Sequence, residues 1–214
     1  MPRSPIRRPP ADLDLSKVLR DIESLPPTLT SQSLFGNNLP LEVEVGSGKG
    51  LFLANASEQT PTHNFVGIEI QFKCAEHAAG RLAKAKVGNA IMISGNAEPL
   101  FLERVDPASL EAVHVYFPDP WWKKKHRKRR VLNPTSIVSY ARSIRSGGRL
   151  HFWTDVLDYF EDTVEMIAEL APELGVPIPE VEIEADHDLD YRTHFERRSR
   201  KNRIPVYRVC YEKR

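Results

Sequence analysis

The chain has 214 residues, of which 41% are hydrophobic, and it carries 30 Lys and Arg against 29 Asp and Glu. This length fits one domain with extensions, and ordinary hydrophobicity with little net charge excludes a wholly disordered chain. The opening residues lack the apolar segment of a signal peptide, and no stretch approaches the roughly 20 apolar residues that cross a membrane. Cys74 and Cys210 form neither a disulfide framework nor a zinc site. We therefore expect a cytoplasmic protein without a membrane segment or a bound metal.

Residues 1–33 are predicted to form an N-terminal arm, partly disordered with a short helix, and residues 34–214 to form the folded domain. The arm opens with a Pro- and Arg-rich stretch that has little apolar surface to bury. A helix is predicted over roughly Ser16–Leu25, with Ser16 as its N-cap, because Pro26 and Pro27 then stop it.

From Leu41 onward, short strand patterns alternate with helical patterns. The predicted strands are Leu41–Val45, Asn64–Ile68, Ala90–Ile93, Ala112–Phe117, Arg149–Trp153, Val181–Ala185 and Val206–Tyr211. The predicted helices run from Leu51 to before Pro61, from Phe72 to about Val87 with Gly88 at C′, from Pro134 to Ser146 before Gly147-Gly148, and from Val156 to Ala171. Such alternation implies right-handed crossovers, so the sequence predicts a doubly wound α/β domain with an open, mainly parallel sheet.

Positive charge is concentrated in two segments of the chain. Residues 123–130 hold seven basic residues and no acid, and residues 192–203 hold six basic residues and one acid. The rest of the chain is therefore acidic overall. Concentrated cations are typical of a surface that neutralises nucleic-acid phosphates, although a solvated loop or a nuclear-localisation-like address gives the same pattern.

Acids and amides stand where the predicted parallel strands end. Ligands of such sheets bind beyond the carboxyl ends of the strands. The residues at these ends are Glu44 with the loop that follows it, Glu69, Asn96, Asp119 and Asp155. This density of carboxylates is higher than structural turns require, so the sequence predicts a ligand site at this edge of the sheet.

A glycine loop, Gly46-Ser47-Gly48-Lys49-Gly50, follows the first of these strands. It is not the dinucleotide fingerprint, because Leu51 stands at the last glycine position, and it is not a Walker loop, because Val43 stands at the first. Glu44 would repel a pyrophosphate and attract an ammonium group, and Glu69 can accept hydrogen bonds from both hydroxyls of a ribose. The pattern favours a nucleoside that carries an amino acid, and the alternative is a glycine turn beside two incidental surface acids.

The combination of ExGxGxG with an acid ending the second strand resembles class I S-adenosylmethionine-dependent methyltransferases. Further along, Phe117-Pro118-Asp119-Pro120-Trp121 is followed by Lys123 and by the basic run His126-Arg127-Lys128-Arg129-Arg130. Together with Thr154-Asp155 and Thr193-His194-Phe195-Glu196, these segments make the chain similar to the tRNA (guanine-N7)-methyltransferases from about residue 34 to its end.

The resemblance implies a Rossmann-like class I methyltransferase fold for residues 34–214, with an open, mostly parallel twisted sheet, helices on both faces and a C-terminal antiparallel hairpin. It implies an enzyme that transfers a methyl group from S-adenosyl-L-methionine to N7 of a guanosine in the variable loop of tRNA. Carried over residue by residue, it implies cofactor binding by Glu44, Gly46, Gly48, Gly50, Glu69, Asn96 and Asp119, catalysis by Asp119, and substrate binding by Lys123, Asp155, Thr193, His194, Phe195 and Glu196.

Two positions depart from the family pattern. Asn96 stands where an Asp is usual, and because its amide still accepts and donates hydrogen bonds at an adenine edge, we expect a changed cofactor affinity rather than its loss. Trp122 stands where the family has a smaller or polar residue. Either Trp121 or Trp122 stacks on a base, or one of them only packs the loop against the domain.

Methylation at guanine N7 requires no general base, because that atom has an exposed lone pair. The protein must instead align N7 with the methyl group, exclude water and stabilise the charge that moves to the purine. Asp119 can also accept hydrogen bonds from the N1–H and amine of guanine, which would select guanine over adenine. The structural alternatives are a turn residue between prolines for Asp119 and a helix cap for Thr154 or Asp155.

Three other functions compete with this interpretation. A noncatalytic RNA-binding protein with a relict cofactor fold would use both basic segments but has no use for the strand-end acids. A class I methyltransferase acting on a protein or small molecule leaves residues 123–130 without a purpose, and an NAD enzyme is disfavoured by Leu51. The expected partner is tRNA, and the sequence leaves monomer and homodimer open.

Overall fold

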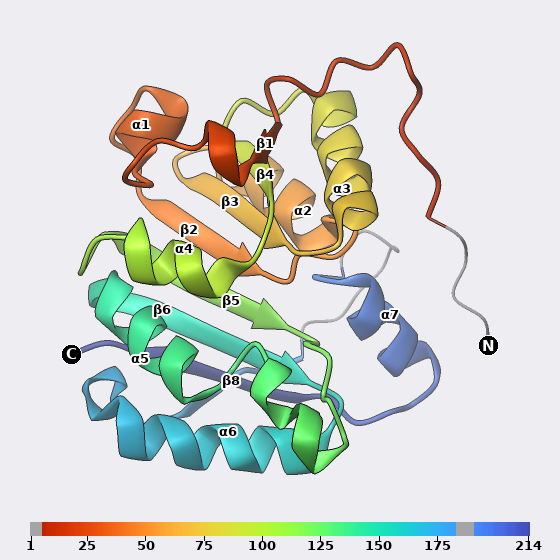
Figure 1. Ribbon diagram of the computed structural model, residues 1–214. Helices are drawn as coiled ribbons and strands as arrows, with labels where there is room; N and C mark the ends of the chain where they lie inside the picture. Colours follow the sequence, from red (N-terminus) through yellow and green to blue (C-terminus); the bar gives the residue numbers. More distant parts are fainter. Residues whose placement is uncertain (1–5, 183–190) are drawn as a thin grey trace.

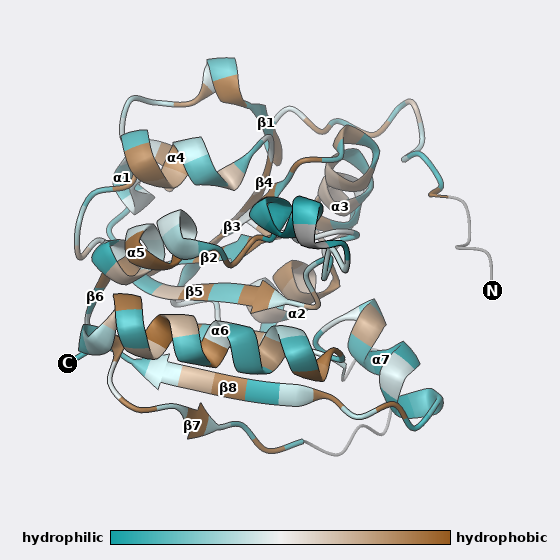
Figure 2. Ribbon diagram, turned by 60° about the horizontal axis from the view of Figure 1, so that its bottom comes forward, coloured by the Kyte–Doolittle hydropathy of each residue, from teal (hydrophilic) through white to brown (hydrophobic). Residues whose placement is uncertain are grey.

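The computed structural model describes residues 6–182 and 191–214 of the chain. Its centre is an eight-stranded sheet in the order β1-β4-β3-β2-β5-β6-β8-β7 (Figure 1). The strands are β1 (Leu19–Asp21), β2 (Leu41–Val45), β3 (Asn64–Glu69), β4 (Ala90–Ser94), β5 (Leu110–Tyr116), β6 (Ile144–Thr154), β7 (Ile178–Pro179) and β8 (Tyr207–Glu212). The first six pair in parallel, and β8 pairs antiparallel with β6 and with β7, which lies beside it at the edge of the sheet (Figure 2). This confirms the predicted fold class, including the C-terminal antiparallel hairpin.

Helices cover both faces of the sheet. They are α1 (Ser31–Phe35), α2 (Leu51–Gln59), α3 (Phe72–Ala85), α4 (Ala97–Glu103), α5 (Pro134–Ser143), α6 (Leu157–Leu170) and α7 (His194–Lys201), with short 3-10 helices η1 (Ile22–Ser24), η2 (Lys124–Arg129) and η3 (Pro172–Leu174). The face that looks forward in Figure 1 packs against α4, α5 and α6, and the other face packs against α2 and α3. None of these helices is long and apolar enough to cross a membrane.

The larger core fills the space between the sheet and helices α4, α5 and α6. Strand alternation decides which side chains enter it. In β2, Leu41, Val43 and Val45 belong to this core, so Glu42 and Glu44 face the opposite side. The same alternation in β5 and β6 selects Val113, Val115, Leu150 and Phe152 for the core. Glu44, His114 and His151, which lie opposite one another in the register, therefore share the other face with Glu42.

The smaller core, on that other face, is built largely from small side chains. Ala75, Ala78 and Ala79 of α3 are fully buried in it. They let α3 approach the glycine loop so closely that a Cβ on Gly50 would lie 2.6 Å from the Cβ of Ala78. Gly50 also has a φ of +67°, a conformation that glycine adopts at no steric cost. Gly50 therefore sets the distance between α3 and the glycine loop.

The helix predicted over roughly Ser16–Leu25 is wrong. Leu19–Asp21 form strand β1 instead, and Ile22–Ser24 form the 3-10 helix η1. β1 pairs in parallel with β4, with Leu19 opposite Met92. The open edge of β4 offers main-chain hydrogen bonds that outweigh the local helix propensity. The boundary of the arm at residue 33 stays a prediction.

Several predicted element bounds also change. α3 ends at Ala85 with Lys86 in the left-handed conformation, so Gly88 is not its C′ residue. α5 ends at Ser143, because β6 already begins at Ile144 and includes both glycines that were expected to close the helix. The sequence patterns do not predict α1, α4 or α7, which are short helices of five to eight residues.

The strand predicted over Val181–Ala185 is only partly testable. Residues 183–185 lie outside the described residues, and Val181 and Glu182 are not in a strand. The hairpin partner of β8 is β7 instead, where Ile178 pairs with Cys210.

Gly50→Ala is expected to lower the free energy of unfolding by roughly 2–5 kcal/mol, because it combines left-handed strain with a clash against Ala78. Urea unfolding measures the change. Gly88→Ala is the matched control, because nothing lies within 4 Å of a Cβ at that position. Equal stability of the two variants would contradict the packing argument.

Candidate functional site

The glycine loop between β2 and α2 is held against the end of β3. The main-chain N–H of Gly46 donates to the oxygen of Ile68 at 2.8 Å. The N–H of Gly48 donates to Oε2 of Glu69 at 2.9 Å, and the other oxygen of Glu69 accepts from the N–H of Gln71 at 2.8 Å. Two main-chain donors therefore fix the buried Glu69 carboxylate beside the loop.

Glu44 ends β2 at the base of this loop, and only 3% of its surface is exposed. Its Oε2 atom has no hydrogen-bond partner among the described residues. Burial raises the pKa of Glu44 to about 8, and the nearby Glu69 adds to this rise while a hydrogen bond from Ser47 opposes it. A buried carboxyl with an unpaired oxygen is unfavourable until a cation or donor approaches it. The geometry therefore suits a ligand with a positively charged group.

Asn96 lies in the loop after β4, where it is exposed. Its Oδ1 accepts a hydrogen bond from the N–H of Glu98 at 3.2 Å, so it caps α4. The loop adjoins the end of β3, because the N–H of Gly95 donates to the main-chain oxygen of Glu69 at 3.0 Å. The structure thus brings the loops of Glu44, Glu69 and Asn96 to one edge of the sheet.

Asp119 is exposed on a strained turn after β5. Phe117 and Trp121, neither of them glycine, have φ values of +50° and +44°. Each such residue costs about 1–3 kcal/mol and persists only where its surroundings impose it. Arg130 holds this turn, because its Nε donates to the main-chain oxygen of Pro120 at 2.9 Å.

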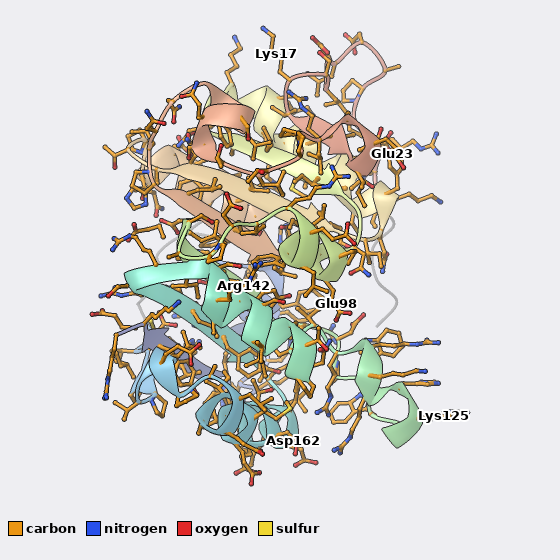
Figure 3. All side chains as sticks on the ribbon, turned by 60° about the vertical axis from the view of Figure 1, so that its left-hand side comes forward. Lys17, Glu23, Glu98, Lys125, Arg142 and Asp162 are labelled. Atoms are coloured by element: carbon orange, nitrogen blue, oxygen red, sulfur yellow. The ribbon has the colours of Figure 1, made fainter. Side chains whose placement is uncertain are left out.

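Arg130 differs from the rest of the basic run. It is 6% exposed, its guanidinium lies 4.3 Å from the ring centroid of Tyr159, and its Nη1 is 2.9 Å from Oδ2 of Asp162. It therefore serves the fold and is not free to track a phosphate. Among the side chains of this run that the structure describes, the exposed cations are Lys123, Lys125, Arg127, Lys128 and Arg129. Lys125 points away from the body of the protein (Figure 3).

The two tryptophans of this loop have different surroundings. Trp121 is half-buried, with the guanidinium of Arg129 at 5.2 Å from its ring centroid and the ring of His126 edge-on at 5.9 Å. Trp122 is 67% exposed. Trp121 therefore packs within the loop, and Trp122 is the ring that is open to a ligand.

Thr193 and Glu196 build the start of α7. Oγ1 of Thr193 accepts from the N–H of Glu196 at 3.0 Å, which caps the helix. Glu196 in turn accepts from the N–H of Arg192 at 2.7 Å and lies 3.5 Å from Nη2 of Arg208. Both side chains are buried, so their polar atoms hold the segment in place.

His194 and Phe195 connect α7 to other parts of the molecule. The ring of Phe195 stacks on Phe117 with centroids 6.1 Å apart, although it is still 43% exposed. Nη2 of Arg81 on α3 donates to Nε2 of His194 at 3.3 Å. Burial, helped by surrounding positive charge, lowers the pKa of His194 to about 4, so the ring is neutral at pH 7 and can accept this bond.

Asp155 lies directly after β6 and is exposed. Neither Thr154 nor Asp155 caps α6, whose N-cap is Val156 with no side-chain cap, although Oγ1 of Thr154 accepts from the N–H of Val156 at 3.2 Å. Asp155 instead accepts from Oγ of Ser199 on α7 at 3.5 Å. Through this contact and the stacking of Phe195, α7 joins the loops after β5 and β6.

Arg192 is a half-buried anchor that the sequence patterns do not single out as a site residue. Its Nη1 donates to the hydroxyl of Tyr116 at 2.7 Å, and its guanidinium lies 5.0 Å from the ring centroid of Trp153. The hydroxyl of Tyr116 contacts Nδ1 of His114 at 2.9 Å, and Nε2 of His114 contacts Glu42 at 2.6 Å. This chain of polar contacts links the start of α7 to the middle of the sheet.

A second branch of the same polar network lies on β6. The ring of His151 stacks on His114 with centroids 4.8 Å apart, and its Nδ1 contacts Glu180 at 3.0 Å. The other oxygen of Glu180 accepts from Nε1 of Trp153 at 2.6 Å. The period-two placement of polar and aromatic residues on β2, β5 and β6 is the sequence signal that could have indicated such a network.

Comparisons with known proteins place these features in a family. The family described as "Putative methyltransferase" matches residues 38–209. A curated tRNA (guanine-N(7)-)-methyltransferase of Rhodopirellula baltica is 62% identical over all of this chain and 81% of its own length. The protein of the same name from Listeria innocua is 31% identical over 83% of this chain and 82% of its own. The solved structure of 16S rRNA methyltransferase KamB has the same fold, with a TM-score of 0.62 at 16% identity, covering 86% of this chain and 92% of its own.

His114→Gln is expected to change how stability depends on pH. Burial, opposed by the hydrogen bond to Glu42, lowers the pKa of His114 to about 4, so between pH 6.5 and 4 the unfolded chain binds a proton that the folded chain does not. The wild type therefore loses up to about 1.4 kcal/mol per pH unit through this residue as the pH falls, and the variant does not. Urea unfolding at pH 7, 6 and 5 should show that the wild type exceeds the variant in free energy of unfolding by less at pH 5 than at pH 7. A gap that stays constant over this range would contradict the assignment.

Proposed function

The chain belongs to the family of the tRNA (guanine-N(7)-)-methyltransferases, and from this premise we propose that it transfers a methyl group from S-adenosyl-L-methionine to N7 of a guanosine in the variable loop of tRNA. The observation that carries the proposal is the buried, unpaired oxygen of Glu44 at the base of the glycine loop. A phosphate-bearing ligand would be repelled there, and an amino-acid ammonium group would be attracted.

The residues at the strand ends fit this cofactor. Glu44 would hold the ammonium group, and Glu69 has lone pairs left for ribose hydroxyls after its two main-chain bonds. A Cβ at Gly46 or Gly48 would meet nothing within 4 Å, so the main chain is open to close approach of a ligand. Asn96 would meet the adenine edge through the part of its amide that does not cap α4. When bound, the cofactor supplies an activated methyl group on a sulfonium.

Asp119 is the proposed catalytic residue, on the turn held by Arg130. Guanine N7 carries no proton, so the task of Asp119 is to orient the base through its N1–H and amine and to stabilise positive charge on the purine. A preorganised turn suits that task, because it does not have to reorganise as the charge develops. This is consistent with a backbone strained on both sides of the residue.

The substrate side of the site is proposed to lie along the basic run and α7. Lys123 and its exposed neighbours would contact phosphates, and Trp122 would stack on a base. Asp155, His194 and Phe195 would face the nucleotide, whereas Thr193 and Glu196 would act by holding α7 in position. The proposed tRNA substrate supports the expected cytoplasmic location.

The geometry of the site does not support either alternative function. A noncatalytic RNA-binding protein would have no reason to bury Glu44 and Glu69 side by side beneath its binding surface, since buried acids are unfavourable and repel phosphates. A methyltransferase for a non-tRNA substrate would leave the exposed cations of residues 123–129 unused. Both remain outcomes of the experiment that follows.

The proposed function is tested with unmodified tRNA and methyl-labelled S-adenosylmethionine, followed by digestion and identification of the labelled nucleoside. Label in 7-methylguanosine is expected from the wild type, with Asp119→Asn slower by roughly 100-fold. Asp106→Asn is the matched control, because Asp106 also precedes a proline but is exposed at the opposite end of β5. Cofactor binding without label in tRNA would indicate another acceptor, and Asp119→Asn at wild-type rate would exclude its catalytic role.

Glu44→Gln is expected to abolish a proton release that accompanies cofactor binding. At pH 6.5 Glu44 is protonated, since burial raises its pKa to about 8, and an approaching ammonium favours the ionised form. The wild type should therefore release close to one proton, measured by calorimetry in two buffers of different ionisation enthalpy.

Affinity should rise with pH from about 5 to 7 in the wild type and stay flat in Glu44→Gln. Glu103→Gln, an exposed glutamate at the end of α4, should behave as the wild type. Equal proton release from Glu44→Gln and the wild type would overturn the assignment.

A further inference from the structure

Arg81 is a half-buried cation without a carboxylate partner among the described residues. Its Nε donates to the main-chain oxygen of Lys49 at 3.4 Å, and its Nη2 donates to Nε2 of His194 at 3.3 Å. Burial lowers the pKa of Arg81 from its usual value, and no acid opposes this effect. The side chain therefore carries a desolvation penalty that no acid of the described chain offsets.

Other arginines with little exposed surface have closer partners, although Nε of Arg208 is buried without a hydrogen-bond partner among the described residues. Arg130 pairs with Asp162, and Arg208 lies 2.9 Å from Glu182 and 3.5 Å from Glu196. Arg142 donates to two main-chain oxygens at 2.6 and 2.7 Å. Arg81, like Arg142, has no acid among its described partners, and its guanidinium keeps N–H groups available in a planar arrangement that matches an oxyanion.

The surroundings of Arg81 are positively charged. The groups that lower the pKa of His194 besides burial are Arg81, Arg197, Lys49 and His77, which come from the glycine loop, α3 and α7. We call Lys49, His77, Arg81 and His194 the Arg81 cluster. The acid on this part of α3 is Glu76, which lies 3.9 Å from Arg8.

The N-terminal segment adds further cations to this surface. The main-chain oxygen of Arg7 accepts from Nδ1 of His77 at 2.8 Å. The ring of Pro9 packs on Gly80, where a Cβ would lie 2.6 Å from Cγ of Pro9. These contacts fix the segment along α3 on the side where α7 also lies (Figure 1). The exposed side chains of Arg7 and Arg8 therefore flank the Arg81 cluster.

The Arg81 cluster lies apart from the proposed cofactor acids. The Cα atom of Arg81 lies about 13 Å along α3 from that of Phe72, where the helix begins, and the Arg81 side chain meets the glycine loop at Lys49. It contacts the main-chain oxygen of Lys49, whereas Glu69 contacts the N–H of Gly48. A ligand on Arg81 thus reaches the molecule from the flank formed by α3 and α7.

We propose that the Arg81 cluster binds a phosphodiester group of the tRNA, so that the flank formed by α3, α7 and residues 7–8 is a second part of the tRNA interface, separate from residues 123–129. The proposal rests on the proposed function, because tRNA is the polyanion which that function brings to the protein. Each phosphate neutralised by a fixed cation releases counterions, which makes the contribution measurable as a salt dependence.

The test measures binding of unmodified tRNA, without cofactor, over a series of salt concentrations for the wild type, Arg81→Gln and Arg81→Lys. Arg81→Gln should lower the slope of log affinity against log salt by about one unit and weaken binding roughly tenfold at 0.1 M salt, while Arg81→Lys retains most of the slope. Arg145→Gln is the matched control. It removes an exposed arginine at the start of β6, away from the strand-end edge, and should change neither the salt slope nor the affinity.

Arg7→Gln is a second variant that is not expected to disturb folding, because the Arg7 side chain is exposed and only its main chain contacts His77. It should also lower the slope, by less than one unit. Unchanged slopes in Arg81→Gln and Arg7→Gln would overturn the proposal, and so would a loss of cofactor affinity in Arg81→Gln, measured by calorimetry, with tRNA binding intact. Formation of 7-methylguanosine by the wild type is measured on the same preparations, so failure of the proposed function is recorded separately from failure of this site.

Discussion

The hydrogen bond from the Gly48 main chain to the Glu69 carboxylate determines much of the site, because it joins the ends of two neighbouring parallel strands. It requires left-handed glycines in the loop, and it holds one buried acid close to another, Glu44. Glu44 then has no partner for one oxygen and keeps its proton near neutral pH. The edge of the sheet is therefore prepared for a cation by burial and by a like charge, and not by an exposed acidic surface.

The face of β5 and β6 that is turned away from α4, α5 and α6 is covered mainly by polar contacts. The helices α4, α5 and α6 cover only one face of these strands, and α2 reaches the other face through Phe52, whose ring is 4.6 Å from that of His114. The polar network that includes Glu180 and Arg192 occupies the rest. Because Arg192 immediately precedes the N-cap of α7, the position of α7 depends on a network buried in the sheet. Arg81 holds the same helix from α3, so α7 is attached on two sides.

Much of the fold followed from local patterns. The alternation in Leu41–Val45 and the glycines behind it correctly predicted β2 and a tight loop, because both depend on neighbours in sequence. The helix expected over Ser16–Leu25 failed since β1 gains its hydrogen bonds from β4, about seventy residues away. The basic run was predicted as one surface, yet Arg130 is buried against Tyr159, a residue of α6 that charge counting does not consider.

The sequence by itself determined the alternation of the central strands and longer helices, the family, and which residue types stand at the strand ends, because periodicity and motif spacing are local properties. Only the tertiary structure decided which of these side chains are free. It engaged Thr193 and Glu196 in holding α7, left Asp119 exposed on a strained turn, and placed Arg81 beside Lys49 and His194 with no acid among the described residues. Burial and pairing depend on residues that are distant in sequence, and these partners set the charge and availability of each group.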